Sequence, residues 1–141
     1  MAAAAIKLEP GARVTFRKTM TVAEQAMFTG ISGNLGPLDV DAVKAKTLGA
    51  PGMLSFELVV ASLLTTCLSR LSGPSHRIHA LDLRFPAAVP VGGTVEATAE
   101  VMSLDGERAR CRLVCTLDQG GVVVEGEATL APLSATVAAK V

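Results

Sequence analysis

The segment from Met53 to Leu71 constrains the fold of this chain more than any other feature. Apolar residues lie on every side of it, as in a helix that is buried on most faces. It also carries Glu57, Arg70, three Ser and two Thr, and its longest unbroken apolar run is Leu58 to Ala61. A membrane-spanning helix needs about 20 consecutive, predominantly apolar residues. We therefore predict a buried central helix that begins at Pro51-Gly52, where a proline is tolerated in the first turn, and that spans no membrane.

Beyond residues 72–75 the apolar residues recur with a period of two, which is typical of half-buried antiparallel strands. Turn residues separate the alternating segments, which lie at residues 81–85, 95–101, 109–117 and 122–130. A chain of 141 residues has room for one core. The sequence thus predicts a single α+β domain over residues 1–141, with an antiparallel sheet wrapped around one long helix. The tail over residues 132–141 is rich in Ala and Thr, and we expect it to be frayed.

Shorter elements precede the central helix. Residues 12–20 resemble a first strand, and Thr21 and Glu24 have the spacing of a capping box, which predicts a short helix that ends near Gly30. Residues 31–38 combine Gly, Asn and Pro and predict a structured loop. A second short helix should follow from Ala42, with Asp39 or Asp41 as its cap, and end at Gly49.

Composition excludes several classes of function. Thirteen Lys and Arg balance thirteen Asp and Glu, and the chain has no Trp or Tyr. It therefore lacks the positive charge and the aromatic side chains that nucleic-acid binding needs. The mean hydropathy of +0.45 indicates that a second subunit covers part of the apolar surface.

The cysteines and histidines indicate neither a disulfide framework nor a metal site. The chain has an odd number of cysteines and no CxxC pair, the three positions being Cys67, Cys111 and Cys115. His76 and His79 have no Asp or Cys at the spacing of metal ligands. The first residues reach Lys7 too early for the core of a signal peptide. We therefore expect a reducing, cytoplasmic location and no bound metal.

Two motifs frame the region before the central helix. Residues 28–41 read F-T-G-I-S-G-N-L-G-P-L-D-V-D, and residues 51–54 read P-G-M-L. They resemble the signature of the MaoC-like hot-dog enzymes, the (R)-specific enoyl-CoA hydratases, in which F-x-x-x-S-G-D-x-N-P-x-H-x-D precedes H-G-M-L. Residues 85–92 and 126–128 extend the similarity over nearly the whole chain. The resemblance implies a hot-dog fold and a thioester of coenzyme A or of acyl carrier protein as substrate or ligand. It also implies a homodimer or a dimer of dimers, with the acyl group in a tunnel at the subunit interface.

The catalytic positions of that signature are changed here. In the family, an Asp and a His five residues apart activate water, and these positions are Asn34 and Asp39 in this chain. Asn cannot accept a proton, whereas Asp39 can act as a base, and burial that raises its pKa would make it a stronger one. The Asn of the motif has become Gly36, and the His of H-G-M-L has become Pro51.

Glu57 offers a second carboxylate. A carboxylate in a buried apolar helix needs a partner or a raised pKa. The spacing P-G-x-L-x-x-E also resembles hot-dog acyl-carrier-protein dehydratases and some hot-dog thioesterases, in which this Glu is catalytic, although the His of the dehydratases corresponds to Val43. A catalytic Glu57 and one paired with an Arg, or exposed, both remain open.

The resemblance thus implies two groups of site residues, catalytic Asn34, Asp39 and Glu57 and substrate-binding Ser32, Pro37, Gly52 and Met53. The backbone N–H of Gly52, at the start of the central helix, would polarise the thioester carbonyl, although Pro51-Gly52 can also be a simple helix start. We expect no cofactor other than the acyl-CoA itself. Hydration or dehydration is the first hypothesis. Thioester hydrolysis and a non-catalytic acyl-CoA-binding or scaffold subunit are the alternatives.

Overall fold

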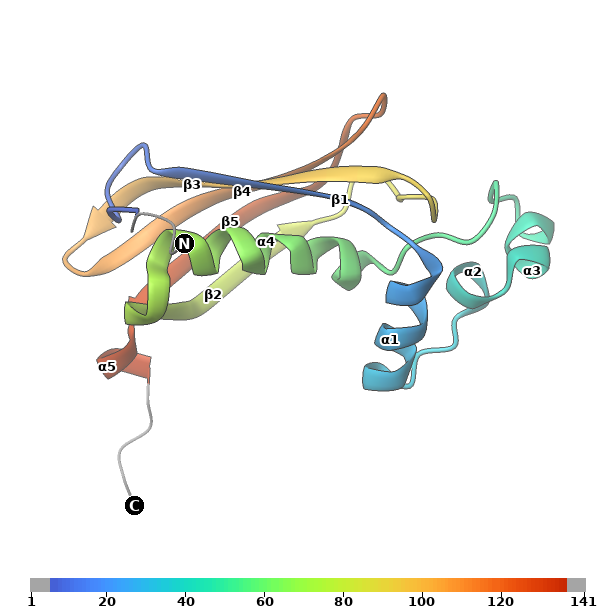
Figure 1. The fold of residues 1–141 in the computed structure, drawn as a ribbon, viewed down its shortest axis with the longest axis horizontal. Helices are drawn as coiled ribbons and strands as arrows, with labels where there is room; N and C mark the ends of the chain where they lie inside the picture. Colours follow the sequence, from blue (N-terminus) through green and yellow to red (C-terminus); the bar gives the residue numbers. More distant parts are fainter. Residues whose placement is uncertain (1–5, 137–141) are drawn as a thin grey trace, which may run out of the picture.

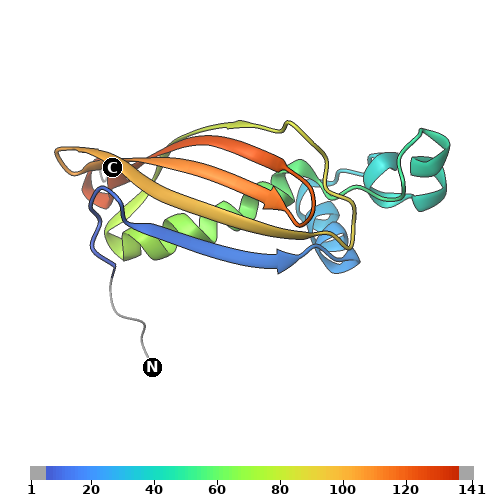
Figure 2. The same ribbon diagram turned by 90° about the horizontal axis from the view of Figure 1, so that it is seen from above.

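The computed structural model describes residues 6–136 of the chain. Five strands form one antiparallel sheet in the order β1-β3-β4-β5-β2, and the long helix α4 lies along one face of it (Figures 1 and 2). This confirms the predicted α+β architecture. The elements in chain order are β1 (Arg13–Thr19), α1 (Val22–Ser32), α2 (Pro37–Val40), α3 (Ala42–Thr47), α4 (Glu57–Ser72), the 3-10 turn η1 (Gly73–Ser75), β2 (His76–Arg84), β3 (Thr94–Asp105), β4 (Arg108–Leu117), β5 (Val122–Pro132) and α5 (Leu133–Thr136).

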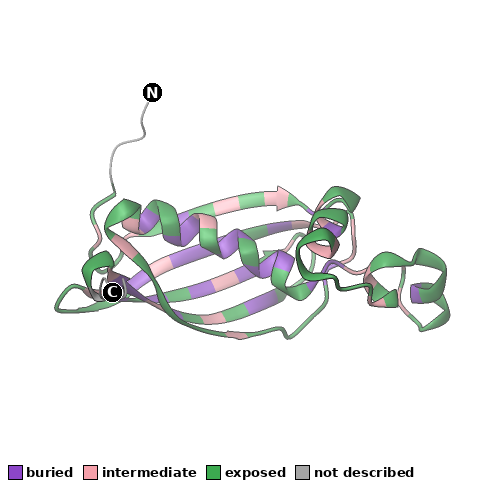
Figure 3. Cartoon of the chain, turned by 90° about the horizontal axis from the view of Figure 1, so that it is seen from below, coloured by how far each residue is buried: buried purple, intermediate pink, exposed green. Residues whose placement is uncertain are grey.

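The core lies between α4 and the sheet. Alternate residues of the strands are buried beneath the helix, as the period of two predicts (Figure 3). Each fully buried Leu or Val side chain contributes about 1.5–3 kcal/mol to folding. The residues of β3 and β4 that face α4 are Val95, Ala97, Ala99, Val101, Ala109, Cys111, Leu113 and Cys115.

The three cysteines belong to this core. Cys67, Cys111 and Cys115 are free and buried. Burial raises the pKa of Cys111 to about 11 and that of Cys115 to about 12. The cysteines therefore pack as small, uncharged side chains.

The central helix begins later than the sequence predicts. Met53 and Ser55 form backbone hydrogen bonds to the loop before β3: Val91 N–H donates to Met53 O at 2.9 Å, and Ser55 N–H donates to Val89 O at 2.7 Å. These bonds hold the segment before α4 in an extended conformation, so the first helical residue is Glu57. The expectation that Pro51-Gly52 begins the helix is wrong, because tertiary pairing outweighs the local helix-start signal.

The expected burial of α4 on most sides is also corrected. A stripe of residues at helical spacing is exposed along its length, formed by Leu58, Ser62, Thr65 and Ser69. Glu57 is exposed as well. The Glu57 carboxylate is therefore not buried on an apolar face of α4.

Two other boundaries differ from the expectations. Helix α1 extends to Ser32 and ends at Gly33, whose φ of 74° is left-handed. The expected frayed tail starts in regular structure, because Pro132 ends β5 and residues 133–136 form a helical turn. Residues 137–141 of that tail lie outside the described part of the chain.

Helices α2 and α3 project beyond the end of the sheet, and α1 connects them to β1 (Figure 2). This arrangement leaves many apolar side chains of α1 and of the loop that follows it exposed, among them Met27 at 61%, Ile31 at 83% and Leu35 at 68%. Large exposed apolar surfaces commonly mark binding or subunit interfaces.

Candidate active site

The loop after α1 is shaped by side-chain hydrogen bonds. Ser32 Oγ donates to Phe28 O at 2.7 Å and accepts the N–H of Asn34 at 3.1 Å. Thr29 Oγ1 donates to Asn34 O at 2.9 Å. The hydroxyl of Ser32 thus holds the end of α1 in place, and its binding of substrate stays a prediction.

Asn34 has a defined orientation. Its Oδ1 accepts the N–H of Gly36 at 2.8 Å. Because a backbone N–H only donates, the atom that faces it must be the amide oxygen. The NH₂ group of Asn34 is therefore the part that remains to donate hydrogen bonds to a ligand.

Gly36 lies between Asn34 and Asp39. A Cβ atom at this position would be 2.9 Å from Asp39 Oδ2 and 3.2 Å from Asn34 Oδ1. The two side chains therefore approach the same point, and any side chain at position 36 would crowd the Asp39 carboxylate.

Asp39 lines a pocket of about 350 Å³ between α1 and the loop. It is the one ionisable side chain in a lining that is otherwise apolar or neutral, formed by Val22, Gln25, Ala26, Thr29, Leu35, Asp39, Val40 and Met53. Burial raises the pKa of Asp39, and the nearby Glu57 carboxylate raises it further. The condition under which Asp39 would be a stronger base, burial that raises its pKa, therefore holds.

Glu57 is close enough to affect Asp39, but it is exposed at the first position of α4. Within residues 6–136 no ion pair to an Arg holds its carboxylate. Pairing with an Arg is therefore not observed in this part of the chain, and the catalytic role of the exposed Glu57 stays a prediction.

The substrate-binding residues expected from the sequence are only partly gathered at this pocket. Met53 lines it. Pro37 begins α2 and is exposed, outside the pocket lining. Gly52 precedes the first residue of α4, so the helix dipole does not reinforce its N–H as expected. No heavy atom lies within 4 Å of the point where a Cβ of Gly52 would be, so there is open space beside its Cα.

Gln25 was not among the residues expected from the sequence. It is 4% exposed, and its Nε2 donates to Asp39 O at 2.7 Å and to Leu54 O at 2.8 Å. Its Oε1 accepts the N–H of Phe56 at 3.2 Å. The sequence signal that could have identified Gln25 is its position three residues before Phe28, which places a polar residue on the inner face of a capped helix.

Comparisons with known proteins show the family of the chain. The model of the MaoC like domain matches residues 5–124. The chain belongs to the MaoC-like domain family.

Two enzymes and one solved structure show the similarity over most of the length. An (R)-specific enoyl-CoA hydratase of Rhodospirillum rubrum is 35% identical over 130 residues, with 87% of each chain covered. A 3-hydroxybutyryl-CoA dehydratase of Methylorubrum extorquens is 32% identical over 123 residues, covering 86% of this chain and 78% of the other. The structure of an (R)-hydratase from A. caviae involved in PHA biosynthesis is 29% identical, with a TM-score of 0.83 over 87% of this chain and 96% of that one. The predicted hot-dog fold is confirmed.

Within residues 6–136, this MaoC-like protein has neither a cluster of possible metal ligands nor a membrane-spanning helix. Residues 6–136 contain no group of three or more His, Cys, Asp or Glu side chains that could hold a metal ion. In the same part of the chain, no helix is long and apolar enough to cross a membrane.

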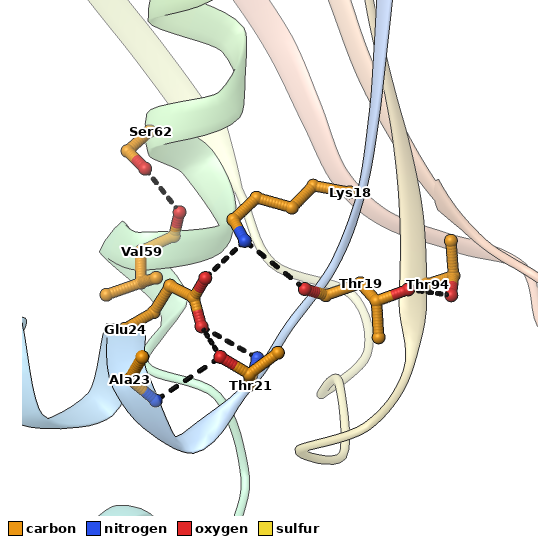
Figure 4. A network of polar contacts seen from close by, with 8 residues as sticks. All are labelled: Lys18, Thr19, Thr21, Ala23, Glu24, Val59, Ser62 and Thr94. Carbon is orange, nitrogen blue, oxygen red and sulfur yellow. Dashed lines mark hydrogen bonds and ion pairs between the residues drawn. The ribbon is translucent and has the colours of Figure 1, made fainter.

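Helix α1, which carries Gln25 and leads to Asn34, is fixed at its start by a polar network (Figure 4). The Glu24 carboxylate pairs with the Lys18 ammonium of β1 and accepts the N–H of Thr21 at 2.8 Å and the Thr21 hydroxyl. Thr21 Oγ1 in turn accepts the N–H of Ala23 at 3.3 Å. The predicted capping box is confirmed, and Lys18 extends it to the sheet.

This network should make stability depend on pH. The Lys18 ammonium and then the Thr21 hydroxyl lower the pKa of Glu24 from 4.5 to about 2. Since the folded-state pKa is depressed, the stabilisation is present above pH 4.5 and is lost as the pH falls towards 2. We expect Glu24→Gln to lower the free energy of unfolding by about 1 kcal/mol at pH 7, the size of a helix-cap effect. In urea titrations the difference should shrink below pH 4.5.

The control is Glu125→Gln on the exposed face of β5, which should change stability little at either pH. An equal loss for Glu24→Gln at pH 7 and at pH 2.5 would contradict the electrostatic origin of the effect.

Proposed function

We propose that this protein catalyses the reversible addition of water to the carbon–carbon double bond of a 2-enoyl thioester, as a hydratase or dehydratase. The observation that carries the proposal is Asp39, a carboxylate with a raised pKa in an apolar pocket beside Asn34. The activities of the two enzymes similar in sequence support the same chemistry.

In the proposed step, the Asp39 carboxylate takes a proton from a water molecule while the water oxygen bonds to C3 of the enoyl group. The electrons of the double bond move towards C2 and the thioester carbonyl. A proton returned by Asp39 to C2 completes the addition, so that one water is consumed and the carboxylate is restored. The reverse sequence is dehydration.

Asn34 and Gly52 supply hydrogen bonds in this proposal. The NH₂ group of Asn34 orients the water or the substrate, because its oxygen is already bound to Gly36 N–H. The backbone N–H of Gly52, which has open space beside its Cα, donates to the thioester oxygen, where negative charge develops. Glu57 acts at a distance, by keeping the proton affinity of Asp39 high.

Replacement of the proposed base tests the mechanism. General-base catalysis contributes roughly 10²–10⁴-fold to a rate. We therefore expect Asp39→Asn to lower kcat/KM for crotonyl-CoA hydration at least about 100-fold. Asp105→Asn in the β3–β4 hairpin, where the Asp is exposed, is the matched control and should retain activity.

Free CoA should be measured in the same reactions. Release of CoA without hydration would indicate a thioesterase. Binding of acyl-CoA with no turnover at any chain length would indicate the non-catalytic alternative.

The pH dependence tests the link between Glu57 and Asp39. A base works only when ionised, so kcat/KM should fall as the pH drops through the raised pKa of Asp39. Glu57→Gln removes one cause of that raised pKa, and the acid limb of the pH–rate profile should move to lower pH. Glu107→Gln, at an exposed site in the hairpin, should leave the limb in place. An acid limb that stays in place in Glu57→Gln would show that Glu57 does not act on Asp39.

A homodimer, or a dimer of dimers, is part of the proposal. Strand β2 pairs only with β5 and ends one edge of the sheet. An exposed edge strand has unpaired N–H and C=O groups, and here it also exposes apolar side chains, Ile78 at 38% and Leu81 at 49%. A second copy that packs against this edge would cover these side chains. The contact between the two copies would form the interface at which we propose that the acyl group binds.

Substitution at this edge tests the dimer. A lysine is a common means of blocking an edge strand. We expect Leu81→Lys to halve the mass measured by light scattering, whereas Leu104→Lys, at an exposed site on β3, should keep it. Wild-type protein that is already monomeric would refute the assembly.

A further inference from the structure

Gln25 is the only buried residue of α1, and both polar atoms of its side chain have hydrogen-bond partners in the protein. Its two Nε2 hydrogens go to the carbonyl oxygens of Asp39 and Leu54, at 2.7 and 2.8 Å. Its oxygen takes the N–H of Phe56 at 3.2 Å. Because carbonyls only accept and an N–H only donates, the orientation of the amide is fixed by its partners.

These partners belong to different segments of the site. Asp39 lies in the short helix α2, and Leu54 lies in the extended segment before α4. Phe56 is the N-cap residue of α4, and its own side chain forms no capping hydrogen bond. One buried amide thus connects the backbone at the proposed base with the start of the helix that carries Glu57.

We propose that Gln25 is a positioning residue that sets the separation between Asp39 and Glu57. It acts through the backbone of Asp39 and Phe56, to which its amide is hydrogen-bonded. The inference rests on the proposed function, in which Asp39 is the base. The raised pKa of Asp39, caused by burial and by Glu57, agrees with two carboxylates held near each other.

The chemistry of Gln and Glu gives a sharp test. An ionised Glu has the shape of Gln but only accepts hydrogen bonds, so it would repel the carbonyls of Asp39 and Leu54. A protonated Glu regains one donor. Relative to the wild type at the same pH, Gln25→Glu should therefore be most impaired at neutral pH, and the deficit should shrink as the pH falls. Gln25→Met removes all three hydrogen bonds at similar volume.

The experiment compares these two variants with the wild type and with Gln119→Glu, the same chemical change at an exposed turn. Two readouts are needed: kcat and KM for crotonyl-CoA hydration, and the titration of the Asp39 carboxyl followed by ¹³C NMR. Small displacements of a catalytic group can lower a rate as much as about 100-fold. We expect kcat of Gln25→Met to fall roughly tenfold or more, with a smaller change in KM.

In Gln25→Met the Asp39 titration should move down towards the usual range of an aspartate, because the carboxyl leaves its position near Glu57. The profile of Gln25→Glu should approach the wild type at low pH, and Gln119→Glu should match it throughout. If Gln25→Met fails to fold, the comparison of Gln25→Glu at two pH values still decides.

An unchanged Asp39 titration in folded Gln25 variants would overturn the inference and leave Gln25 a purely structural residue. If the wild-type protein shows no turnover, the proposed function is refuted. The positioning role of Gln25 is not, because the NMR titration reports on Asp39 without any substrate. A shifted Asp39 titration in that case still supports the positioning role.

Discussion

The packing of α4 against one face of the antiparallel sheet is the interaction on which the rest of this molecule depends. Alternate small and branched side chains of β3 and β4 form a surface that the buried face of α4 covers. Aromatic residues contribute little, and Phe56 at the start of the helix is the largest of the fully buried side chains. The core lies along the helix, and the N-terminus of α4 points to the end of the sheet where α1–α3 project.

The candidate site follows from that geometry. The extended segment before α4 pairs with the loop before β3, while α1 is joined to β1 by Lys18 and Glu24. Between these two supports the loop of Asn34 and Asp39 lies against an apolar pocket, and Gln25 connects the loop with α4. A larger pocket of about 410 Å³ at the other end of α4 contains none of the expected site residues. Its size alone does not make it the site, since chemistry needs a suitable group as well as space.

Local signals in the sequence were sufficient wherever a pattern repeated or a cap had its full set of residues. The period of two placed β3 and β4 correctly, and Thr21 and Glu24 located the start of α1. The start of α4 was misplaced because Pro51-Gly52 is a strong local signal, whereas the backbone pairing of Met53 and Ser55 comes from a loop more than thirty residues away. The same error assigned to Gly52 the support of a helix dipole that it does not have, because α4 begins only at Glu57.

The sequence by itself determined the fold class, the family to which the motif over residues 28–54 points, and the absence of the usual catalytic pair at positions 34 and 39. These are properties of residue types and their spacing. Only the tertiary structure decided that the amide oxygen of Asn34 is occupied, that Asn34 and Asp39 both approach Gly36, and that Gln25 is hydrogen-bonded to the backbone of distant segments. Those features depend on contacts between segments distant in the chain, and local propensity contains no information about which distant backbone atoms will meet.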